Sequence, residues 1–200
     1  MITVVIASYN YGHLAAHCIE TVLGQSQRPE ILFVDDGAGD CKHLQKIYPE
    51  VEYVLRPKNL GIVDNFNDML DRVQTERVMF LGADNWLRTD AIERLSKSKA
   101  DVTTYDIMVV GELRDEIKGR HENELKALEP EIYWKREHSH HGSMVYKTKL
   151  GKRYRYSQNG GTRSEEDENL WNKLIRNQAS VEYIPEAFLY YRRHRENFNK

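Results

Sequence analysis

The chain has 200 residues, enough to bury a substantial core, and its 40% apolar and 30% charged residues are ordinary for a soluble globular protein. Its formal net charge of −2 at pH 7 offers no broad attraction to nucleic acid or to an anionic membrane. No apolar run approaches the roughly 20 residues that span a bilayer, and no signal peptide is evident at the N-terminus.

Strand and helix patterns alternate four times in about the first hundred residues. The strand patterns are short apolar runs, β-branched and nearly continuous in 2–8, which is typical of strands buried on both faces. The helix patterns repeat apolar residues at helical spacing. This alternation predicts a parallel sheet with helices on both faces. The expected strands are 2–8, 30–37, 51–57 and 77–82, and the expected helices are 11–25, 41–50, 61–74 and 88–98.

The second half is less regular, and its composition shifts near residue 113. It predicts a strand at 101–113, a strand entering a short helix at 142–150, and a helix at 164–177 with Ser164 as its N-cap. Two more short strands are expected in "SVEYIP" and "AFLYYRRH". Residues 114–141 are charged and histidine-bearing, with little periodicity. We therefore expect one domain over residues 1–200, divided into halves 1–100 and 101–200.

Polar residues follow three of the predicted strands directly. They are Ser8-Tyr9-Asn10, Asp35-Asp36-Gly37 and Asp84-Asn85. Ligands of parallel sheets bind beyond the carboxyl ends of the strands. The three groups are therefore expected to meet at one edge and to form a binding site.

Five motifs in order carry a resemblance to a known family. They are the opening "TVVIASYNYGHLAAHCIETVLGQSQRPEILFVDDG", then "NLG", "VMFLGADN", "EEDENLW" and "YYRRH". Together they resemble the family 2 glycosyltransferases. The resemblance implies a GT-A fold, that is, an α/β domain with a Rossmann-like, mostly parallel sheet, helices on both faces and a small C-terminal acceptor-side lobe.

The resemblance also implies a donor nucleotide site. An aromatic face such as Tyr9 offers base stacking, and the Asp36 carboxylate can accept the imino N–H of uracil, which favours a pyrimidine or guanine donor over adenine, with a UDP-sugar as the expected donor. Alternatively, Tyr9 packs over the first helix and Asp36 caps the second. The implied donor residues are Ala7, Tyr9, Asn10, Asp36, Asn59, Gly61 and Ala83.

Asp84 is the candidate metal ligand, because Mn²⁺ and Mg²⁺ accept carboxylate and diphosphate oxygens. Alternatively it caps the helix at 88–98, although Thr89 and Asp90 are better placed for that. His194 is a second candidate ligand, or else a solvated histidine. Diphosphate or acceptor contacts are expected from Asn85, Arg192 and Arg193.

The resemblance makes Asp167 the general base on the acceptor hydroxyl, with Glu166 beside it, and implies inversion at the anomeric carbon. Alternatively, Ser164-x-x-Asp167 is a capping box, so that Asp167 bonds only the helix terminus. A carboxylate in the first turn of a helix is kept ionised by the helix dipole, as a base requires.

Two features depart from the family pattern. The metal motif is Ala83-Asp84-Asn85 rather than two aspartates flanking one residue. Phe66-Asn67 stands where relatives carry Arg-Asn, so an arginine for the diphosphate is missing. These departures leave a non-catalytic nucleotide-sugar binder as the alternative, whereas a Rossmann oxidoreductase is disfavoured because no G-x-G-x-x-G follows the first strand.

The remaining expectations concern partners and location. "HSHHG" at 138–142 is interpreted as an acceptor-side loop rather than a zinc site, since no cysteine lies nearby. The acceptor is expected to be a glycan, a lipid-linked molecule or a protein, and the chain to form a homo-oligomer or to be part of a longer polypeptide. Cys18 and Cys41 predict reduced thiols in a cytoplasmic protein, with membrane contact limited to its periphery.

Overall fold

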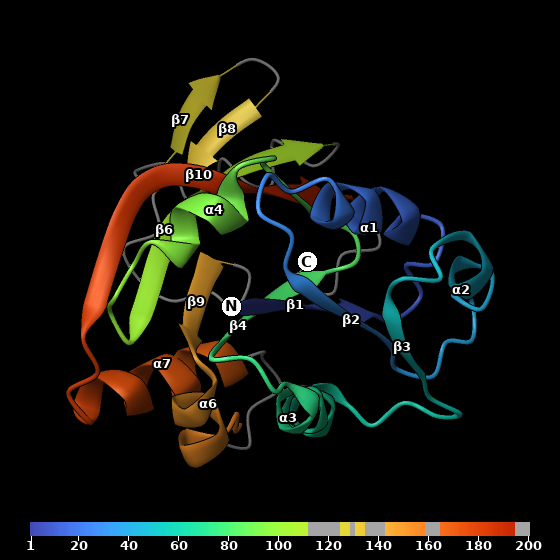
Figure 1. Cartoon of the computed structure of the whole chain (residues 1–200). Coiled ribbons are helices and arrows are strands. Elements are labelled where there is room, and N and C mark those ends of the chain that lie inside the picture. Colours follow the sequence, from blue (N-terminus) through green and yellow to red (C-terminus); the bar gives the residue numbers. More distant parts are fainter. Residues whose placement is uncertain (112–124, 129–130, 135–142, 159–164, 195–200) are drawn as a thin grey trace.

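The computed structural model describes residues 1–111, 125–128, 131–134, 143–158 and 165–194. Its first half confirms the predicted alternation (Figure 1). The strands are β1 (Ile2–Ser8), β2 (Glu30–Asp35), β3 (Glu52–Leu55) and β4 (Arg77–Gly82), and they pair in parallel in the order β3-β2-β1-β4. The helices are α1 (Ala15–Leu23), α2 (Leu44–Ile47), α3 (Ile62–Arg72) and α4 (Ala91–Ser96).

The second half extends this sheet to ten strands. The path continues β4-β9-β6-β10-β5, and β8 pairs with β6 and with β7 off this path. Strand β9 is antiparallel to both β4 and β6, whereas β6 and β10 are parallel, so the sheet is mixed beyond β4. The elements are β5 (Trp86–Leu87), β6 (Val102–Gly111), β7 (Leu125–Leu128), β8 (Glu131–Trp134), β9 (Met144–Lys147), α6 (Thr148–Tyr154), α7 (Glu166–Arg176) and β10 (Val181–Arg193).

The two short strands expected near the C-terminus are one. Strand β10 runs unbroken from Val181 to Arg193 and pairs with β6, with register shifts between Ile184 and Ala187 and between Ala187 and Leu189. Pro185 lies in this irregular stretch. Since proline has no N–H for the ladder, it is accommodated at a bulge rather than ending the strand. The prediction of two strands was therefore wrong, and the continuous strand carries residues 190–194 back to the edge where β4 ends.

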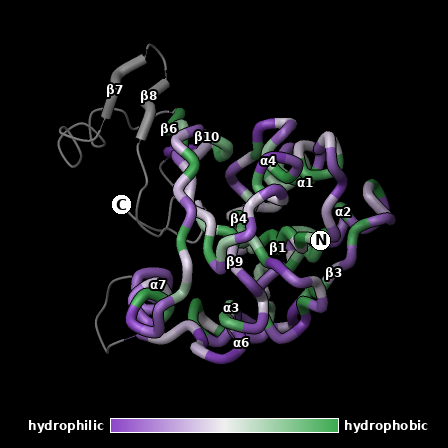
Figure 2. The backbone as a smooth tube through the Cα atoms, turned by 60° about the vertical axis from the view of Figure 1, so that its left-hand side comes forward, coloured by the Kyte–Doolittle hydropathy of each residue, from purple (hydrophilic) through white to green (hydrophobic). Residues whose placement is uncertain are grey.

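Two apolar layers bury the sheet (Figures 1 and 2). Val4 and Ile6 of β1 face a cluster that includes residues of α1 and α4, whereas Val5 between them faces α3 and α7. Successive side chains of a strand point to opposite faces, which explains why an uninterrupted apolar run covers both. Cys18 and Cys41 are buried free thiols, as predicted.

One asparagine fixes the packing on the face of the sheet that α3 and α7 cover. Asn67 of α3 donates to the Tyr156 carbonyl and accepts from the Tyr156 N–H, both at 3.0 Å. The Tyr156 ring packs on Phe66 and Phe80, and its hydroxyl lies 2.8 Å from that of Tyr146. Phe66-Asn67 is therefore a packing element joining α3 to the segment after α6.

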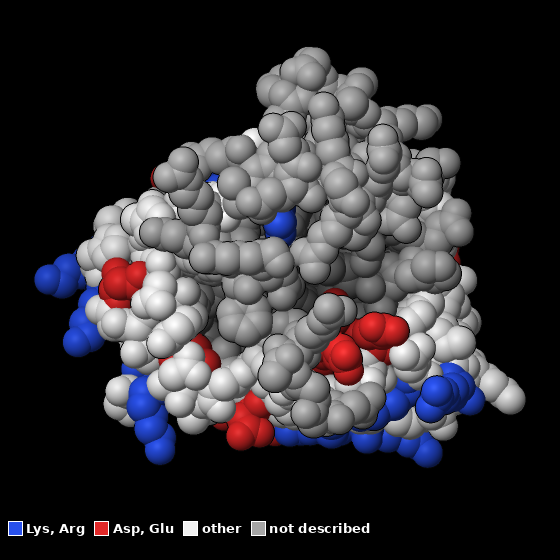
Figure 3. Space-filling model, turned by 180° about the vertical axis from the view of Figure 1, so that it is seen from behind, with Lys and Arg blue, Asp and Glu red and all other residues white. Residues whose placement is uncertain are grey.

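Charged side chains of both signs reach the face seen in Figure 3, and basic ones gather along its lower edge, beneath α3, α6 and α7. The exposed lysine and arginine of α6 are Lys149 and Arg153. No helix in the described segments is long and apolar enough to cross a membrane. Ser164, "HSHHG" at 138–142 and most of 114–141 lie outside the described residues.

Candidate active site

The carboxyl ends of β1, β2 and β4 meet at one edge of the sheet, as the sequence predicts. Backbone hydrogen bonds join the segments that follow them. The Ala83 N–H donates to the Ala7 carbonyl at 2.9 Å, and the Asp36 N–H donates to the Ser8 carbonyl at 2.9 Å. The parallel register pairs Ala7 with Gly82 and Ser8 with Asp35. Ala7, Asp36 and Ala83, three of the predicted donor residues, thus lie together.

Asp84 and His194 form a pair at this edge. His194 Nε2 lies 3.2 Å from Asp84 Oδ2. The side chain of His194 is only 11% exposed and that of Asp84 only 7%. The ring of Tyr11 packs edge-on against the imidazole, with centroids 5.5 Å apart. Asp90, not Asp84, occupies the N-cap position of α4, but its carboxylate pairs with Arg88 and does not cap the helix. The structure thus places Asp84 away from helix capping and beside the second candidate ligand.

The residues around Asp84 and Asn85 hold the end of β10 in place. The Arg192 N–H donates to Asn85 Oδ1 at 2.9 Å, and Arg192 Nε donates to the Asp84 carbonyl at 3.0 Å. The guanidinium lies over the Trp86 ring, 4.9 Å from its centroid, and that ring stacks on Tyr190. Cation–π contact and a hydrogen bond therefore orient Arg192 beside the candidate metal ligands. Arg193 is buried, at 7% exposed.

The donor atoms fit a divalent cation. Metal–oxygen bonds of about 2.1 Å in octahedral geometry place neighbouring ligand atoms about 3 Å apart, close to the 3.2 Å between Asp84 Oδ2 and His194 Nε2. Carboxylate oxygen suits Mn²⁺ and Mg²⁺, and imidazole adds a borderline ligand that favours Mn²⁺ over Mg²⁺. The Asp84 carbonyl accepts from Arg192 Nε, whereas the Asp84 carboxylate faces His194.

Asp36 lies in a different environment, buried and next to a cation. Its Oδ1 accepts from the Leu60 N–H at 3.1 Å and lies 3.2 Å from Arg56 Nε. Burial is the largest influence and raises the pKa of Asp36, against the lowering effect of the Leu60 amide and Arg56. These contacts tie Asp36 to the loop that carries "NLG" rather than to the helix that follows it, α2.

A glycine makes this loop approach possible. Gly37 has φ of +89°, and a Cβ there would lie 2.3 Å from the Lys58 carbonyl carbon and 2.4 Å from the Asn59 nitrogen. Only glycine fits that backbone contact. Asn59 Oδ1 in turn accepts from the Gly61 N–H at 2.6 Å, which starts α3. Asn59 and Gly61 therefore lie on the loop that contacts Asp36.

The segment after β1 presents an aromatic ring. Tyr9 is 48% exposed at the sheet edge, so part of its surface is accessible to a ligand. Asn10 adopts φ of +65°, a left-handed conformation that asparagine tolerates better than most residues. The turn that follows Ser8 thus leaves the Tyr9 ring open to a ligand.

Asp167 and Glu166 begin α7 on the opposite layer from α1. Glu166 is 1% exposed, whereas Asp167 is partly exposed and accepts from the Glu168 N–H at 2.8 Å. Three acidic residues occupy the first turn, where the helix dipole stabilises negative charge. The capping-box alternative rests on Ser164, which lies outside the described residues.

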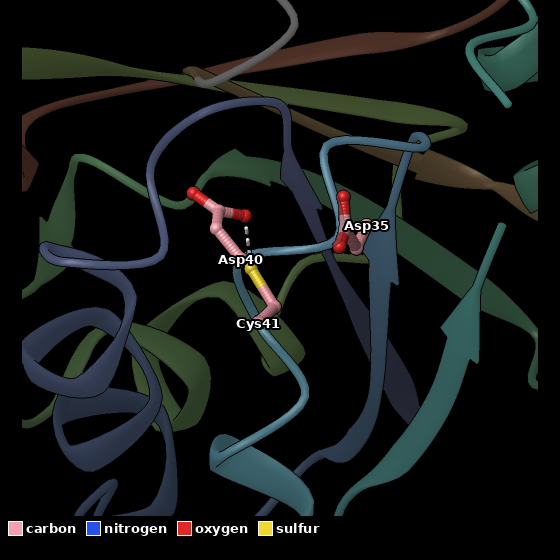
Figure 4. A group of neighbouring side chains, drawn as sticks. All are labelled: Asp35, Asp40 and Cys41. Atoms are coloured by element: carbon pink, nitrogen blue, oxygen red, sulfur yellow. Dashed lines mark hydrogen bonds between the residues drawn. The ribbon is translucent and has the colours of Figure 1, made fainter. Parts of the chain in front are cut away.

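A second acidic group has the composition of a metal site but is occupied by its own loop. The ligand atoms of Asp35, Asp40 and Cys41 lie within 4.8 Å of one another (Figure 4). Asp35 accepts from the Ala38 and Gly39 amides, both at 2.9 Å, and the Cys41 thiol donates to Asp40 at 3.2 Å.

The other Asp40 oxygen accepts from the Gly12 N–H at 2.8 Å. Burial raises the pKa of the Cys41 thiol to about 12, which disfavours the thiolate that binds metals. We therefore interpret this group as the brace of the loop between β2 and α2.

Three residues of the site are absent from the sequence predictions. Arg56 and Asn65 join Asp36 in one network, and Trp86 supports Arg192. Phe66 and Asn67, which stand where relatives carry Arg-Asn, contact Tyr156 instead, whereas Asn65 faces this network. The signal available in the sequence was the position of Arg56, directly after a strand and just before "NLG".

The chain matches known proteins in sequence and in fold. The model of the family described as glycosyl transferase family 2 matches residues 3–178. Glycosyltransferase GlyA of Streptococcus pneumoniae serotype 4 (strain ATCC BAA-334 / TIGR4) is 28% identical over 102 residues, which cover 48% of this chain and 14% of GlyA.

Two solved structures have the same fold. S. aureus TarS in complex with UDP-GlcNAc superposes with a TM-score of 0.73 at 16% identity, over 98% of this chain and 59% of the TarS chain. Mannosyltransferase PcManGT from Pyrobaculum calidifontis, in complex with GDP-Man and Mn²⁺, gives 0.67 at 15% identity, over 98% and 58%. The chain spans less than two thirds of the length of each of these relatives. Because the family model covers most of its residues, the chain belongs to the family 2 glycosyltransferases, with their GT-A fold.

Proposed function

We propose that this chain is a metal-dependent, inverting glycosyltransferase that moves a sugar from a UDP-sugar to an acceptor hydroxyl. The observation that carries the proposal is the Asp84–His194 pair, whose atoms lie 3.2 Å apart at the edge that also holds Asp36. The divalent cation that accompanies the leaving diphosphate and the nucleobase of the same donor then both have candidate partners at this edge of the sheet. Membership of the family supports the activity.

The nucleotide would be held by Tyr9 and Asp36. Stacking of a base on an aromatic ring contributes about 1–3 kcal/mol, and the exposed Tyr9 ring is accessible for it. The ionised Asp36 carboxylate accepts the N3–H of uracil. Guanine presents a comparable N1–H, and the TarS and PcManGT structures contain UDP-GlcNAc and GDP-Man respectively. We favour UDP because uracil presents this N–H alone to the single aspartate, whereas guanine also presents its 2-amino group as a second donor.

The diphosphate would be met by Asp84, His194 and Arg192. A divalent cation bound by the first two would neutralise charge on the leaving group. Arg192 adds a guanidinium that is already oriented by Trp86 and the Asp84 carbonyl. Arg192 thus supplies a positive charge in a chain that lacks the arginine of the family's Arg-Asn pair.

In the transfer step, Asp167 accepts the proton of the acceptor hydroxyl. The acceptor oxygen forms a bond to the anomeric carbon, the bond from that carbon to the diphosphate oxygen breaks, and its electron pair leaves with UDP. Attack from the face opposite the leaving group inverts the anomeric centre. The partial exposure of Asp167 in the first turn of α7 leaves it open to an acceptor and ionised.

A thermal-shift panel tests the donor site first. UDP, dTDP, GDP, CDP and ADP are each added with and without Mn²⁺, since a ligand that binds only the folded state raises the melting temperature. A stabilisation by UDP that requires Mn²⁺ and is lost in Asp84→Ala supports the proposal. No stabilisation by any nucleotide contradicts it.

The alternative is a non-catalytic nucleotide-sugar binder, which the incomplete Ala83-Asp84-Asn85 motif favours. The two are separated by turnover. Metal-dependent release of UDP from a UDP-sugar, with a product of inverted configuration by NMR, is expected of the enzyme. Mn²⁺-dependent UDP binding without release over a panel of glycan, lipid-linked and protein acceptors identifies the binder.

A further inference from the structure

Arg56 is a buried guanidinium at the donor edge of the sheet. It follows β3 directly, its side chain is 8% exposed, and its backbone N–H donates to the Asp35 carbonyl at 3.0 Å. Buried arginines are rare unless their charge and donors are matched. The identity of its partners therefore indicates what this residue is for.

The partners of Arg56 lie on two sides. On the sheet side, Nε lies 3.2 Å from Asp36 Oδ1. On the α3 side, Nε and Nη2 donate to Asn65 Oδ1 at 3.2 and 3.0 Å, and Nη2 donates to Asp68 Oδ2 at 2.5 Å. The planar guanidinium thus spans Asp36 and α3, which a lysine ammonium could not do with the same geometry.

Two contacts of the Asp36 side chain fall on the same oxygen. Oδ1 accepts from the Leu60 N–H at 3.1 Å and faces Arg56 Nε at 3.2 Å. A carboxylate has a second acceptor oxygen in the same plane, so fixing Oδ1 also fixes the direction of Oδ2. Asp36 is 3% exposed, and holding a buried carboxylate ionised requires such a cation.

We propose that Arg56 is a positioning residue that holds Asp36 ionised, with Oδ2 directed at the donor base, and so selects nucleoside diphosphates whose base presents a ring N–H. Uracil, thymine and guanine carry that N–H. Cytosine and adenine present a lone pair at the corresponding ring position, which repels a carboxylate. This inference rests on the proposed donor site and adds the residue that sets its base selectivity.

Calorimetric binding of UDP and CDP to the full chain with Mn²⁺ tests it. We expect Arg56→Gln to weaken UDP binding about tenfold, because Asp36 loses the cation that lies 3.2 Å from its Oδ1. The UDP-to-CDP affinity ratio falls with it, and KM for the UDP-sugar rises while kcat changes less than about twofold. Arg56→Lys restores part of the affinity, because it returns the charge without the fork.

A double-mutant cycle separates positioning from packing. If Arg56 acts through Asp36, Arg56→Gln costs no further UDP affinity in an Asp36→Asn background. The matched control is Arg155→Gln, which removes a guanidinium from Asp71 of the same helix α3, at 2.5 and 3.0 Å, and is expected to leave both affinities unchanged.

The outcomes are distinct. The inference is overturned, with the donor site intact, if Arg56→Gln binds UDP and CDP as tightly as the wild type. It is also overturned if Arg56→Gln costs the same UDP affinity in the wild-type and the Asp36→Asn backgrounds. Failure of the unmodified chain to bind UDP contradicts the proposed function itself. Should Arg56→Gln not fold, the same cycle is run with Arg56→Lys, for which a full, uncoupled loss also overturns the inference.

Discussion

His194 Nε2 lies 3.2 Å from Asp84 Oδ2, although the two residues are 110 positions apart in the chain. Strand β10 makes this contact possible, because it runs without interruption along β6 and ends beside the turn after β4. The cost of bringing such distant groups together is met by the long β6–β10 ladder rather than by the pair itself. A carboxylate and an imidazole so arranged are ready to share one cation.

Removing either member of this pair is expected to weaken metal binding. Asp84→Asn should abolish the Mn²⁺-dependent part of the UDP thermal shift, and His194→Ala should weaken Mn²⁺ binding by about tenfold or more, because one of two protein ligands is lost. The thermal-shift assay measures the first effect, and titration of Mn²⁺ by calorimetry in the presence of UDP measures the second. His43→Ala, an exposed histidine of the region before α2, is the control. Wild-type Mn²⁺ affinity in Asp84→Asn would exclude this pair as the metal site.

The general base can be tested separately from donor binding. Asp167→Asn is expected to lower kcat by about 10²- to 10⁴-fold, the usual contribution of a positioned base, while the affinity for UDP stays unchanged. Glu168→Gln, the exposed neighbour in α7, serves as the control. If Glu166→Gln loses kcat and Asp167→Asn retains it, the role belongs to Glu166 instead.

Much of the donor half of this fold could be predicted from the sequence. Continuous apolar runs such as 2–8 and 77–82 are typical of strands buried on both faces, and parallel strands place their carboxyl ends on one edge. Asp36 and Asp84 follow two such strands. Their convergence was therefore predictable from strand direction alone, without knowledge of any side-chain contact.

The remaining features depend on contacts that local patterns do not encode. Pro185 is typical of a strand end in sequence, whereas a bulge in the ladder with β6 accommodates it in the fold. Arg56 follows a strand like many surface arginines, and only the fold shows that it is buried against Asp36 and α3. The catalytic role of Asp167 and the diphosphate or acceptor contacts of Arg192 and Arg193 stay predictions, because a role requires the substrates and not the positions alone.

Gly82 offers a substitution that disturbs the metal ligands without removing one. A Cβ at Gly82 would lie 2.6 Å from Asp84 Oδ1 and 2.8 Å from Asn85 Nδ2, both ends of side chains that can move. We expect Gly82→Ala to change the free energy of unfolding by less than about 1 kcal/mol, yet to weaken Mn²⁺ binding by about tenfold or more, because the Asp84 carboxylate is displaced from His194.

Chemical denaturation and Mn²⁺ titration of the same samples provide the two readings for Gly82→Ala. Gly24→Ala is the control, since its nearest contact is the Glu20 carbonyl at 3.2 Å, at the end of α1. Unchanged Mn²⁺ affinity in Gly82→Ala would show that the Asp84 carboxylate can be reoriented without loss, so that metal binding does not depend on its position beside His194.

Asp101 makes a prediction about acid stability. Its Oδ1 accepts from Lys147 Nζ at 2.9 Å, and its Oδ2 accepts from the N–H and hydroxyl of Ser180, both at 3.0 Å. These contacts join the segments preceding β6 and β10 to the end of β9. Lys147 is the largest influence, followed by Ser180, and together they lower the pKa of Asp101 to about 2.

Because the folded pKa lies below the unfolded value of about 3.9, this carboxylate stabilises the fold above that value and loses its contribution between roughly pH 4 and pH 2. Asp101→Asn should therefore cost at most about 1 kcal/mol at pH 7, since the partly exposed pair is screened by solvent, and nothing at about pH 2. Urea unfolding over the range from about pH 7 to about pH 2 measures the difference. The control is Glu182→Gln, which removes an exposed carboxylate at the start of β10, and its effect on the free energy of unfolding should not depend on pH in this way. A cost of Asp101→Asn that stays constant with pH would contradict the ion pair's contribution.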